Sequence, residues 1–320
     1  MRIGIDIMGG DFAPKATLEG SILAQKELDP TDKLVLIGDS EIITNYLIDL
    51  GNNPALYDIV HAIDIIGMDE QPTKAFSQKQ ESSIVFGFKL LKENKIDCFS
   101  SAGNSGAMLV GSMYSANPIQ GILRPCITGI LPKEDGSFGV LLDVGTNPDC
   151  KPDNLYQFAI IGSIYAQYVF KIRNPKIGLL NIGEEEEKGN LLCQSAFKLM
   201  KDSTDFNFIG NIESRDLFKD KADVIVCDGF TGNIVLKLAE TIYRQMLKRG
   251  LTDGYFNRWN YENYGGTPIL GVNSTVIVGH GISNNIAIKN MILLSRDVAK
   301  ANLSQQIRTA LEKFSQIKSQ

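Results

Sequence analysis

Lys188 is the residue whose setting points most directly to chemistry. It closes a run of four glutamates, Glu184 to Glu187, that follows an apolar run and precedes a helix-like stretch. A cation in such a turn is well placed to meet an anionic substrate. The glutamates have a plainer interpretation as the first turn of the following helix, where acids are favourable. Successive helical positions diverge by about 100°, so the four acids do not form a one-sided metal site.

Turns rich in glycine form a second group of candidates. They combine backbone N–H donors and small size with asparagine carboxamides, which suits them to bind phosphate or a developing oxyanion. A plain turn role explains any one of them, but it explains the whole set less well. None is a Walker A loop, and the first turn lacks the dinucleotide-binding spacing, so a nucleotide site is disfavoured. The candidates in these turns are Gly9, Gly10, Asp11, Gly103, Asn104, Asn147 and Asn233.

Histidine and cysteine offer little further chemistry. His61 lies in a segment typical of an edge strand, whereas His280, between two glycines after an apolar run, is the better candidate for a site. No serine lies in a G-x-S-x-G context, which disfavours a serine hydrolase. Cys227, beside Asp228, is either a nucleophile or a buried structural thiol, and the second state is the more frequent one. The five cysteines form no C-x-x-C pair, so we expect no metal site and a reducing compartment.

Seven short apolar runs rich in β-branched residues position these turns. Helix-like stretches with apolar residues at three- and four-residue spacing alternate with them, which predicts an α/β fold with a mostly parallel sheet covered on both faces. Ligands of such folds bind beyond the carboxyl ends of the strands, where these turns lie. The predicted strands are 3–7, 34–37, 97–99, 140–142, 177–181, 224–226 and 275–278, and the predicted helices are 16–28, 82–93, 155–170, 191–200, 233–249 and 284–313.

Composition and charge exclude several classes of protein. The 320 residues are 43% hydrophobic and 22% charged, and the net charge of −5 disfavours a nucleic-acid binder. Asp6 lies inside the first apolar run, which excludes a secretory signal, and the longest uncharged stretch is too polar to span a membrane. No repeat or linker marks a boundary, so we expect one α/β domain over residues 1–320, in the cytoplasm.

A basic helix face follows in the last third of the chain. Arg244 and Lys248 are four residues apart and therefore share one side of a helix; Arg249 follows, and Arg258 lies beyond. On an acidic protein such a face is either a solvated helix end or a docking surface for an acidic partner.

Seven motifs, in order, resemble one known family. They are 5–14 (IDIMGGDFAP), 101–107 (SAGNSGA), 121–125 (GILRP), 142–147 (LDVGTN), 179–186 (LLNIGEEE), 227–233 (CDGFTGN) and 264–271 (YGGTPILG). Together they resemble the bacterial phosphate acyltransferases of phospholipid synthesis. The resemblance implies an enzyme that moves a fatty acyl group from acyl carrier protein to inorganic phosphate and releases acyl phosphate. It also implies a homodimer and a three-layer α/β/α fold with one large, mostly parallel mixed sheet, like that of isocitrate and isopropylmalate dehydrogenases.

For such a reaction phosphate is its own nucleophile, so catalysis reduces to positioning and to stabilisation of charge. We expect Lys188 and the backbone N–H groups of the turns at 9–11 and 103–104 to hold phosphate. We expect neither a metal nor another cofactor.

The thioester carbonyl needs a polarising donor, for which Asn233, Asn147 and His280 are the candidates. Asp228 would orient these donors or manage the thiol proton. The acidic carrier protein would dock on the basic residues Arg244, Lys248, Arg249 and Arg258.

Two departures from the family's pattern limit which of its functional residues can be assigned to this chain. Residues 75–83 retain only Lys79 where relatives often carry an arginine, which puts phosphate or carrier contacts from that loop in doubt. Residues 240–265 are expected to protrude as an element for dimer, carrier or membrane contact. This segment is shorter than in many relatives and aromatic, so peripheral membrane contact stays open.

Three other functions remain as alternatives. A phosphotransacetylase-like enzyme would use a coenzyme A thioester. A dehydrogenase on the same fold is disfavoured, since neither a dinucleotide fingerprint nor an aspartate cluster for a metal is present. A non-catalytic scaffold that docks a carrier protein would use the glycine loops only as turns.

Overall fold

The computed structural model describes residues 1–318, and the side chains of residues 1–312. The chain forms two compact units. Unit 1 combines Met1–Pro118 with Tyr261–Lys300, and unit 2 combines Ile119–Asn260 with the chain from Ala301 onward. Each unit has its own strands and helices, and the expectation of one domain over residues 1–320 stays a prediction.

Unit 1 is built on a mostly parallel sheet. Its strands are β1 (Arg2–Asp6), β2 (Lys33–Gly38), β3 (Asp58–His61), β4 (Cys98–Ser101), β10 (Thr267–Leu270) and β11 (Thr275–Val278). They lie in the order β3-β2-β1-β4-β11-β10, and only the pairing of β10 with β11 is antiparallel among these strands. All four residues of β4 are buried, as expected of a central strand covered on both faces.

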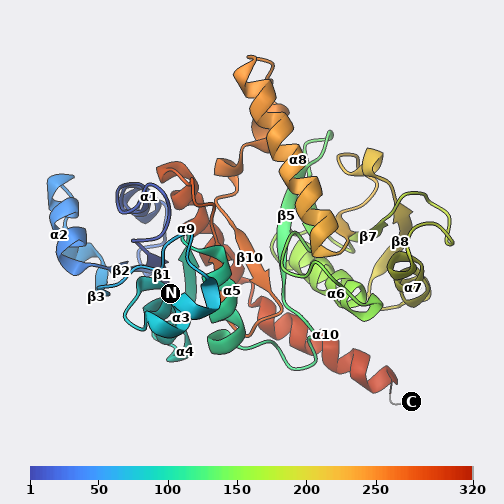
Figure 1. The fold of residues 1–320 in the computed structure, drawn as a ribbon, viewed down its shortest axis with the longest axis horizontal. Helices are drawn as coiled ribbons and strands as arrows, with labels where there is room; N and C mark the ends of the chain where they lie inside the picture. The colour runs from blue at the N-terminus through green and yellow to red at the C-terminus, as the bar shows by residue number, and fades with distance from the viewer. Residues whose placement is uncertain (319–320) are drawn as a thin grey trace. The chain divides into compact units, whose positions relative to one another are not determined.

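Helices lie on both faces of this sheet (Figure 1). They are α1 (Lys15–Gln25), α2 (Ser40–Asp49), α3 (Pro72–Gln78), α4 (Ser83–Lys92), α5 (Ser105–Gly111) and α9 (Asn285–Lys300). α1 and α9 pack together on one face, and α4 packs against β1 and β4 on the other. Gly87 in α4 allows this approach, because a Cβ there would overlap with the ring of Phe99 in β4.

Unit 2 repeats this plan with mostly parallel strands of its own. Its strands are β5 (Cys126–Pro132), β6 (Phe138–Leu142), β7 (Lys176–Leu180), β8 (Asn207–Ile212) and β9 (Val224–Val226). They lie in the order β5-β6-β9-β7-β8, with β5 antiparallel to β6 and the other neighbours parallel. The helices are α6 (Pro152–Tyr168), α7 (Leu191–Met200), α8 (Gly229–Lys248) and α10 (Leu303–Lys318).

The alternation of side chains along β6 and β9 places α6 and α8 on opposite faces of the unit 2 sheet. Gly162 of α6 packs against Leu142 and Val224. The neighbouring residues Leu141 and Ile225 point the other way and belong to the core cluster against which α8 packs. The C-terminal part of α8 extends beyond the sheet of this unit (Figure 1).

The structure confirms the seven predicted strands with shifts of a few residues, and it places β3, with His61, at the edge of the unit 1 sheet. It shows that the single predicted helix over 284–313 is wrong. This segment forms α9 and α10, which are separated at Asn302, whose φ of 48° lies in the left-handed region that a helix cannot contain. Short helices complete the chain: η1 Pro54–Leu56, η2 Ser112–Ala116, η3 Ser214–Asp216, η4 Phe256–Trp259 and η5 Tyr261–Asn263.

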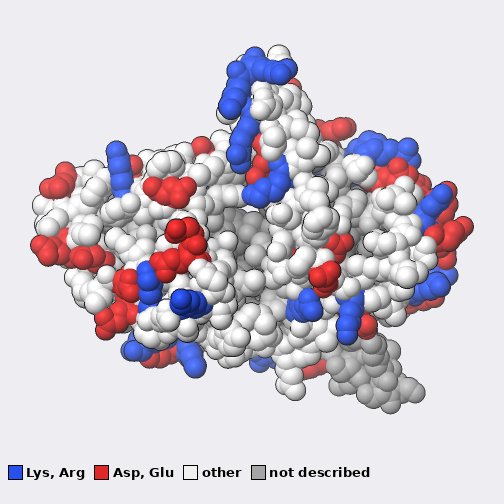
Figure 2. All heavy atoms as spheres, in the orientation of Figure 1, with Lys and Arg blue, Asp and Glu red and all other residues white. Residues whose placement is uncertain are grey.

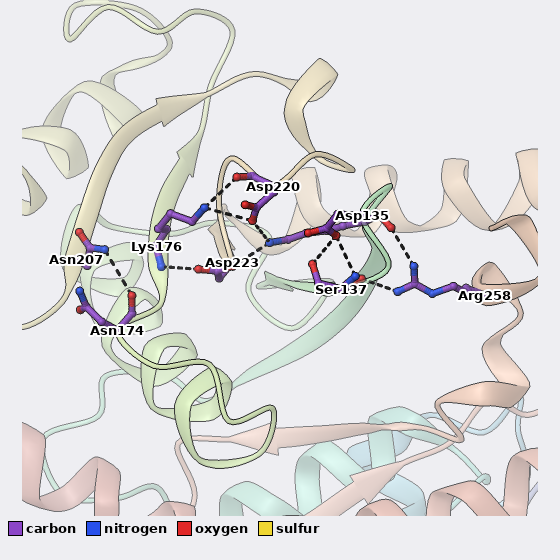
Figure 3. Close-up of polar contacts among 9 residues, drawn as sticks. Asp135, Ser137, Asn174, Lys176, Asn207, Asp220, Asp223 and Arg258 are labelled. Atoms are coloured by element: carbon purple, nitrogen blue, oxygen red, sulfur yellow. Dashed lines mark hydrogen bonds and ion pairs between the residues drawn. The ribbon is translucent and has the colours of Figure 1, made fainter. Parts of the chain in front are cut away.

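An ion-pair network around the buried Lys133 closes the amino-terminal edge of the unit 2 sheet (Figure 3). Lys133 is 1% exposed, and its Nζ lies 2.8 Å from Oδ1 of Asp223 and 3.2 Å from Oδ1 of Asp220. Asp223 also accepts the backbone N–H of Lys176 at 2.8 Å. Hydrogen bonds from Lys176 and Lys133 lower the pKa of Asp220 below its ordinary value. The network therefore ties the turn after β5 to the starts of β7 and β9.

Replacing Lys133 with Met should lower the free energy of unfolding by about 3–5 kcal/mol, because it leaves the Asp223 carboxylate without its buried cation. Urea unfolding measures this loss. Lys198→Met, on the exposed side of α7, is the matched control. Because the pKa of Asp220 is lowered in the folded chain, its stabilisation is present above the ordinary pKa and lost as pH falls through the lowered one. Equal free energies of unfolding for Lys133→Met and Lys198→Met would contradict the stabilising role of the Lys133 ion pairs.

Candidate active site

Turns at the carboxyl ends of β1, β4 and β11 meet within unit 1. A Cβ on Gly9 would lie 2.8 Å from the backbone N of Gly103, so only glycine fits this contact. The backbone N–H of Asp11 donates to the carbonyl of Gly281 at 2.8 Å. The structure thus brings together five of the predicted residues: Gly9, Gly10, Asp11, Gly103 and His280.

Asp6 lies beneath these turns at the end of β1 and is fully buried. Its Oδ2 accepts the Ser101 hydroxyl at 2.6 Å, and its Oδ1 accepts the backbone N–H of Met8 at 3.0 Å. The Ser101 hydroxyl oxygen in turn accepts the N–H of Gly103 at 2.9 Å. Burial raises the pKa of Asp6, although these hydrogen bonds oppose the shift. The carboxyl group therefore links the first two turns from below.

The carboxamide of Asn104 is already committed inside unit 1. Its Oδ1 caps α5 by accepting the N–H of Ala107 at 2.9 Å, and its Nδ2 donates to the carbonyls of Gly67 and Glu70 at 2.9 and 3.0 Å. Asn104 thereby holds the loop at 67–70. The ring of His280 packs edge-on against Tyr261, with 5.2 Å between the ring centroids.

In unit 2, Asp143 plays the part that Asp6 plays in unit 1. Its Oδ1 accepts the backbone N–H of Ile127 at 3.0 Å, and its Oδ2 accepts the backbone N–H and the Nδ2 of Asn147 at 2.6 and 2.9 Å. Burial raises the pKa of Asp143. The Nδ2 of Asn147 also donates to the carbonyl of Pro125 at 2.8 Å. Both N–H groups of this predicted site residue therefore serve the fold.

The start of α8 carries two further predicted site residues, Asp228 and Asn233. Asp228 is the N-cap, and its two oxygens accept the N–H and the hydroxyl of Thr231, each at 2.8 Å. Asn233 follows on the exposed side of the first turns, and no described residue forms a hydrogen bond with its side chain. A Cβ on Gly145 would lie 3.5 Å from its Oδ1, which places Asn233 beside the turn after β6.

Lys188 lies in the loop between β7 and α7. The helix begins at Leu191, after its N-cap Asn190, so the interpretation of the four glutamates as a first helical turn is wrong. Lys188 is exposed and forms no ion pair with a described side chain. β7 and β9 are parallel neighbours, with Leu179 beside Val226. The Lys188 loop and the start of α8 therefore leave adjacent strand ends.

The predicted basic residues differ in how they are held. Figure 2 shows Lys and Arg side chains along α8 up to its tip. Arg244 lies 3.5 Å from Glu240, whereas Lys248 and Arg249 are exposed and have no ion-pair partner among the described side chains. Arg258 donates to the carbonyl of Lys133 at 2.9 Å (Figure 3). Its guanidinium also lies over the ring of Phe138. Arg258 thus attaches the short helix η4, to which it belongs, to the turn after β5.

The thiol of Cys227 is buried between the end of β9 and the start of α8. Burial raises its pKa well above the ordinary value, which favours the inert structural thiol over the nucleophile. In the described part of the chain, no group of three or more His, Cys, Asp or Glu could hold a metal ion. No described helix has the length and apolar character of a membrane span.

Comparison with known proteins decides the family. Residues 1–306 match the family model described as "Fatty acid synthesis protein". The chain is 40% identical over 333 residues to the phosphate acyltransferase of Dictyoglomus turgidum, and 39% identical over 333 residues to that of Brevibacillus brevis, with 98% of both chains covered in each case. The chain therefore belongs to the family of these phosphate acyltransferases. It is an acyltransferase.

Solved structures show the mixed α/β fold of this acyltransferase. The EutD phosphotransacetylase of Staphylococcus aureus matches with a TM-score of 0.65 at 15% identity, covering 93% of this chain and 94% of that one. A 4-hydroxythreonine-4-phosphate dehydrogenase of Burkholderia phymatum matches with a TM-score of 0.50 at 16% identity, covering 94% and 98%. The narrower likeness to isocitrate and isopropylmalate dehydrogenases stays a prediction.

Several residues that shape the candidate site were missed by sequence reasoning. They are the aspartates and asparagines that hold the turns from inside: Asp6, Asp143, Asn181 and Asn211. A signal existed for Asp6, since a carboxylate within an apolar run must have buried partners.

Replacing Asp143 with Ala should lower the free energy of unfolding by about 3 kcal/mol, because three N–H donors would lose their acceptor in a buried position. Thermal and urea unfolding measure the loss, with Asp135→Ala in an exposed turn as the control. Asp143→Asn tests the charge separately. Since burial raises the pKa of Asp143, the stability linked to its protonation is present at low pH and lost as pH rises through the raised pKa. The difference between wild type and Asp143→Asn should change with pH accordingly, and a constant difference would contradict this.

Proposed function

We propose that this acyltransferase moves a fatty acyl group from acyl carrier protein to inorganic phosphate and releases acyl phosphate for phospholipid synthesis. The relatives that it matches are named phosphate acyltransferases. The observation that carries the proposal is Lys188, an exposed cation without an ion-pair partner among the described side chains, on the strand end next to the start of α8. An unneutralised ammonium in this place suits a phosphate dianion.

The reaction does not require a base from the protein. A phosphate oxygen attacks the carbonyl carbon of the thioester, and the new C–O bond forms as the C–S bond breaks. The carrier sulfur leaves as a thiolate, whose ordinary pKa of about 8.5 lets it take a proton from water near neutral pH. The protein must balance the charge on the attacking phosphate and on the carbonyl oxygen. The chain therefore needs a cation and a hydrogen-bond donor, held in place.

Asn233 is the favoured donor to the carbonyl oxygen. Its carboxamide is exposed without a hydrogen bond to a described residue, whereas both N–H groups of Asn147 are engaged inside unit 2. Asp228 fits the orienting role, because its two oxygens hold Thr231 and so fix the helix turn that carries Asn233. A phosphate role for the turns at 9–11 and 103–104 and a carbonyl role for His280 stay predictions.

Replacing Lys188 with Ala should lower the rate of phosphate-dependent thioester loss roughly 100-fold, because one preorganised charge contact with the reacting phosphate is removed. The assay mixes acyl carrier thioester with phosphate, traps acyl phosphate with hydroxylamine and measures the free thiol. Lys198→Ala, on an exposed position of α7, should keep the wild-type rate. An unchanged rate in Lys188→Ala would refute the assignment of the cation.

The same assay separates the alternative functions. Product from the carrier thioester supports the proposal. Product from a coenzyme A thioester alone would favour a phosphotransacetylase-like enzyme. The absence of product with both donors would favour a non-catalytic docking protein.

The carrier protein is proposed to dock on the C-terminal part of α8. Lys248 and Arg249 are exposed and unpaired among the described side chains, and Arg244 shares Glu240 with Lys237. An acidic partner would find there a local positive potential on a chain of net charge −5. Because Arg258 holds its own segment, its contribution to docking would be smaller.

Reversing the charge of Lys248 to Glu should raise KM for the carrier thioester about 5-fold with little change in kcat, since the contact assists encounter and not chemistry. Lys198→Glu changes the net charge equally on another helix and is the control. The difference between the two should shrink as salt is added, because exposed charges are screened. Equal KM values for both variants would place the docking surface elsewhere.

A row of exposed apolar residues on α8 supports the expected homodimer. The row consists of Phe230, Ile234, Leu238 and Ile242. Exposed apolar patches of this kind typically mark contact surfaces. The aromatic residues at 255, 256 and 259 pack on one another and on Phe218, so they are partly used within unit 2. Peripheral membrane contact and a cytoplasmic location stay predictions.

A further inference from the structure

The loop that carries Lys188 is unusually well held for an exposed segment. It runs from the end of β7 at Leu180 to the start of α7 at Leu191. Exposed loops of this length are ordinarily mobile, and a mobile lysine would bind an anion only at an entropic cost. Two asparagines that have no other assigned role hold this one in place.

Two of the four glutamates before Lys188 form ion pairs with other lysines. Glu184 pairs with Lys221 at 2.6 Å, and Glu186 pairs with Lys201 at 3.2 Å. These partners lie outside the loop, so they hold the carboxylates of Glu184 and Glu186. The Lys188 ammonium therefore has no ion-pair partner among the described side chains in spite of four glutamates directly before it.

Asn181 links the two ends of the loop. It is 8% exposed, its Oδ1 accepts the N–H of Ile182 at 2.9 Å, and its Nδ2 donates to the carbonyl of Lys188 at 3.1 Å. Gly189 completes the contact, because its φ of 88° suits glycine and a Cβ there would overlap with Oδ1 of Asn181. The side chain of Asn181 thus fixes the backbone of Lys188 directly.

Asn211 holds the middle of the same loop from the neighbouring strand β8. It is 3% exposed, and its Nδ2 donates to the carbonyl of Glu185 at 2.9 Å. Its partner on β7 is Leu179, and the N–H of Asn181 donates to the carbonyl of Ile212 at 2.9 Å. The loop is therefore attached to the sheet through the carbonyls of Glu185 and Lys188.

We propose that Asn181 is a positioning residue for the phosphate step, which acts by fixing the backbone from which Lys188 reaches the phosphate, with Asn211 as its support. This inference rests on the proposed function. A buried carboxamide that donates to a loop carbonyl gives the loop one conformation, and a shift of about 1 Å in a positioned group can cost roughly 100-fold in rate. Asn181 does not itself contact the reacting atoms.

The test compares steady-state kinetics of Asn181→Ala, Gly189→Ala and Lys188→Ala, with Asn207→Ala as the control on β8. In Asn181→Ala we expect kcat/KM for phosphate to fall about 10- to 100-fold while KM for the carrier thioester stays within about twofold. Asn207, whose side chain donates to the carbonyl of Asn174 outside this loop, should behave as wild type. A purely structural defect would instead lower the fraction of active enzyme and leave both KM values unchanged, which would overturn the proposal.

The double variant Asn181→Ala/Gly189→Ala tests whether the two residues act as one contact. Removing the Asn181 side chain also removes the atom that a Cβ at Gly189 would meet. The losses should therefore not multiply, and the double variant should match the worse single variant within about threefold. Multiplying losses would contradict the shared contact.

A binding measurement gives a readout apart from turnover. Calorimetric titration with inorganic phosphate should give a lower Kd for wild type than for Asn181→Ala. If Asn181→Ala does not fold by circular dichroism, Gly189→Ala displaces the same carboxamide and provides the comparison. If Lys188→Ala keeps its kcat/KM for phosphate, the proposed function of Lys188 fails and this inference fails with it. If Lys188→Ala loses activity while Asn181→Ala and Gly189→Ala do not, only the inference fails.

Discussion

A carboxylate buried at the end of a strand must find hydrogen-bond donors, and the turns of both units depend on this requirement. Asp143 collects the N–H of Ile127 and two N–H groups of Asn147. Asp6 collects the Ser101 hydroxyl and the N–H of Met8. Each carboxylate draws the turn of a neighbouring strand toward its own. Glycine is then needed where those turns touch, as Gly9 does against Gly103.

Most of the fold could be predicted because its signals are local. An apolar run followed by a glycine turn identified strands such as β9, and spacing identified α7 with its correct bounds. Two of the strands that were missed lack the pattern: β10 contains Pro268, and four of the six residues of β8 are only half-buried. The break at Asn302 depends on a left-handed backbone conformation. Asparagine permits this conformation, but its presence in a sequence does not predict it.

The candidate site could be predicted in part: Lys188 and Asn233 lie after strand ends, as expected, while their roles stay predictions. What could not be predicted is which asparagines are available. Asn104, Asn147 and Asn233 all follow strands and look equivalent in the sequence. Carbonyls distant in the sequence, at Gly67 and Pro125, occupy the first two, while the third stays exposed. Availability is thus a property of the tertiary structure.

The division of the chain has a consequence for synthesis on the ribosome. Unit 1 needs Tyr261–Lys300, yet all residues from 119 to 260 emerge first. Until β11 arrives, β4 has only β1 as a neighbour and lacks the second of its two parallel partners, and until α9 arrives, α1 lacks the helix that packs against it. The nascent first unit therefore exposes a sheet edge and an apolar helix face throughout the translation of the second, a period in which it depends on protection from aggregation.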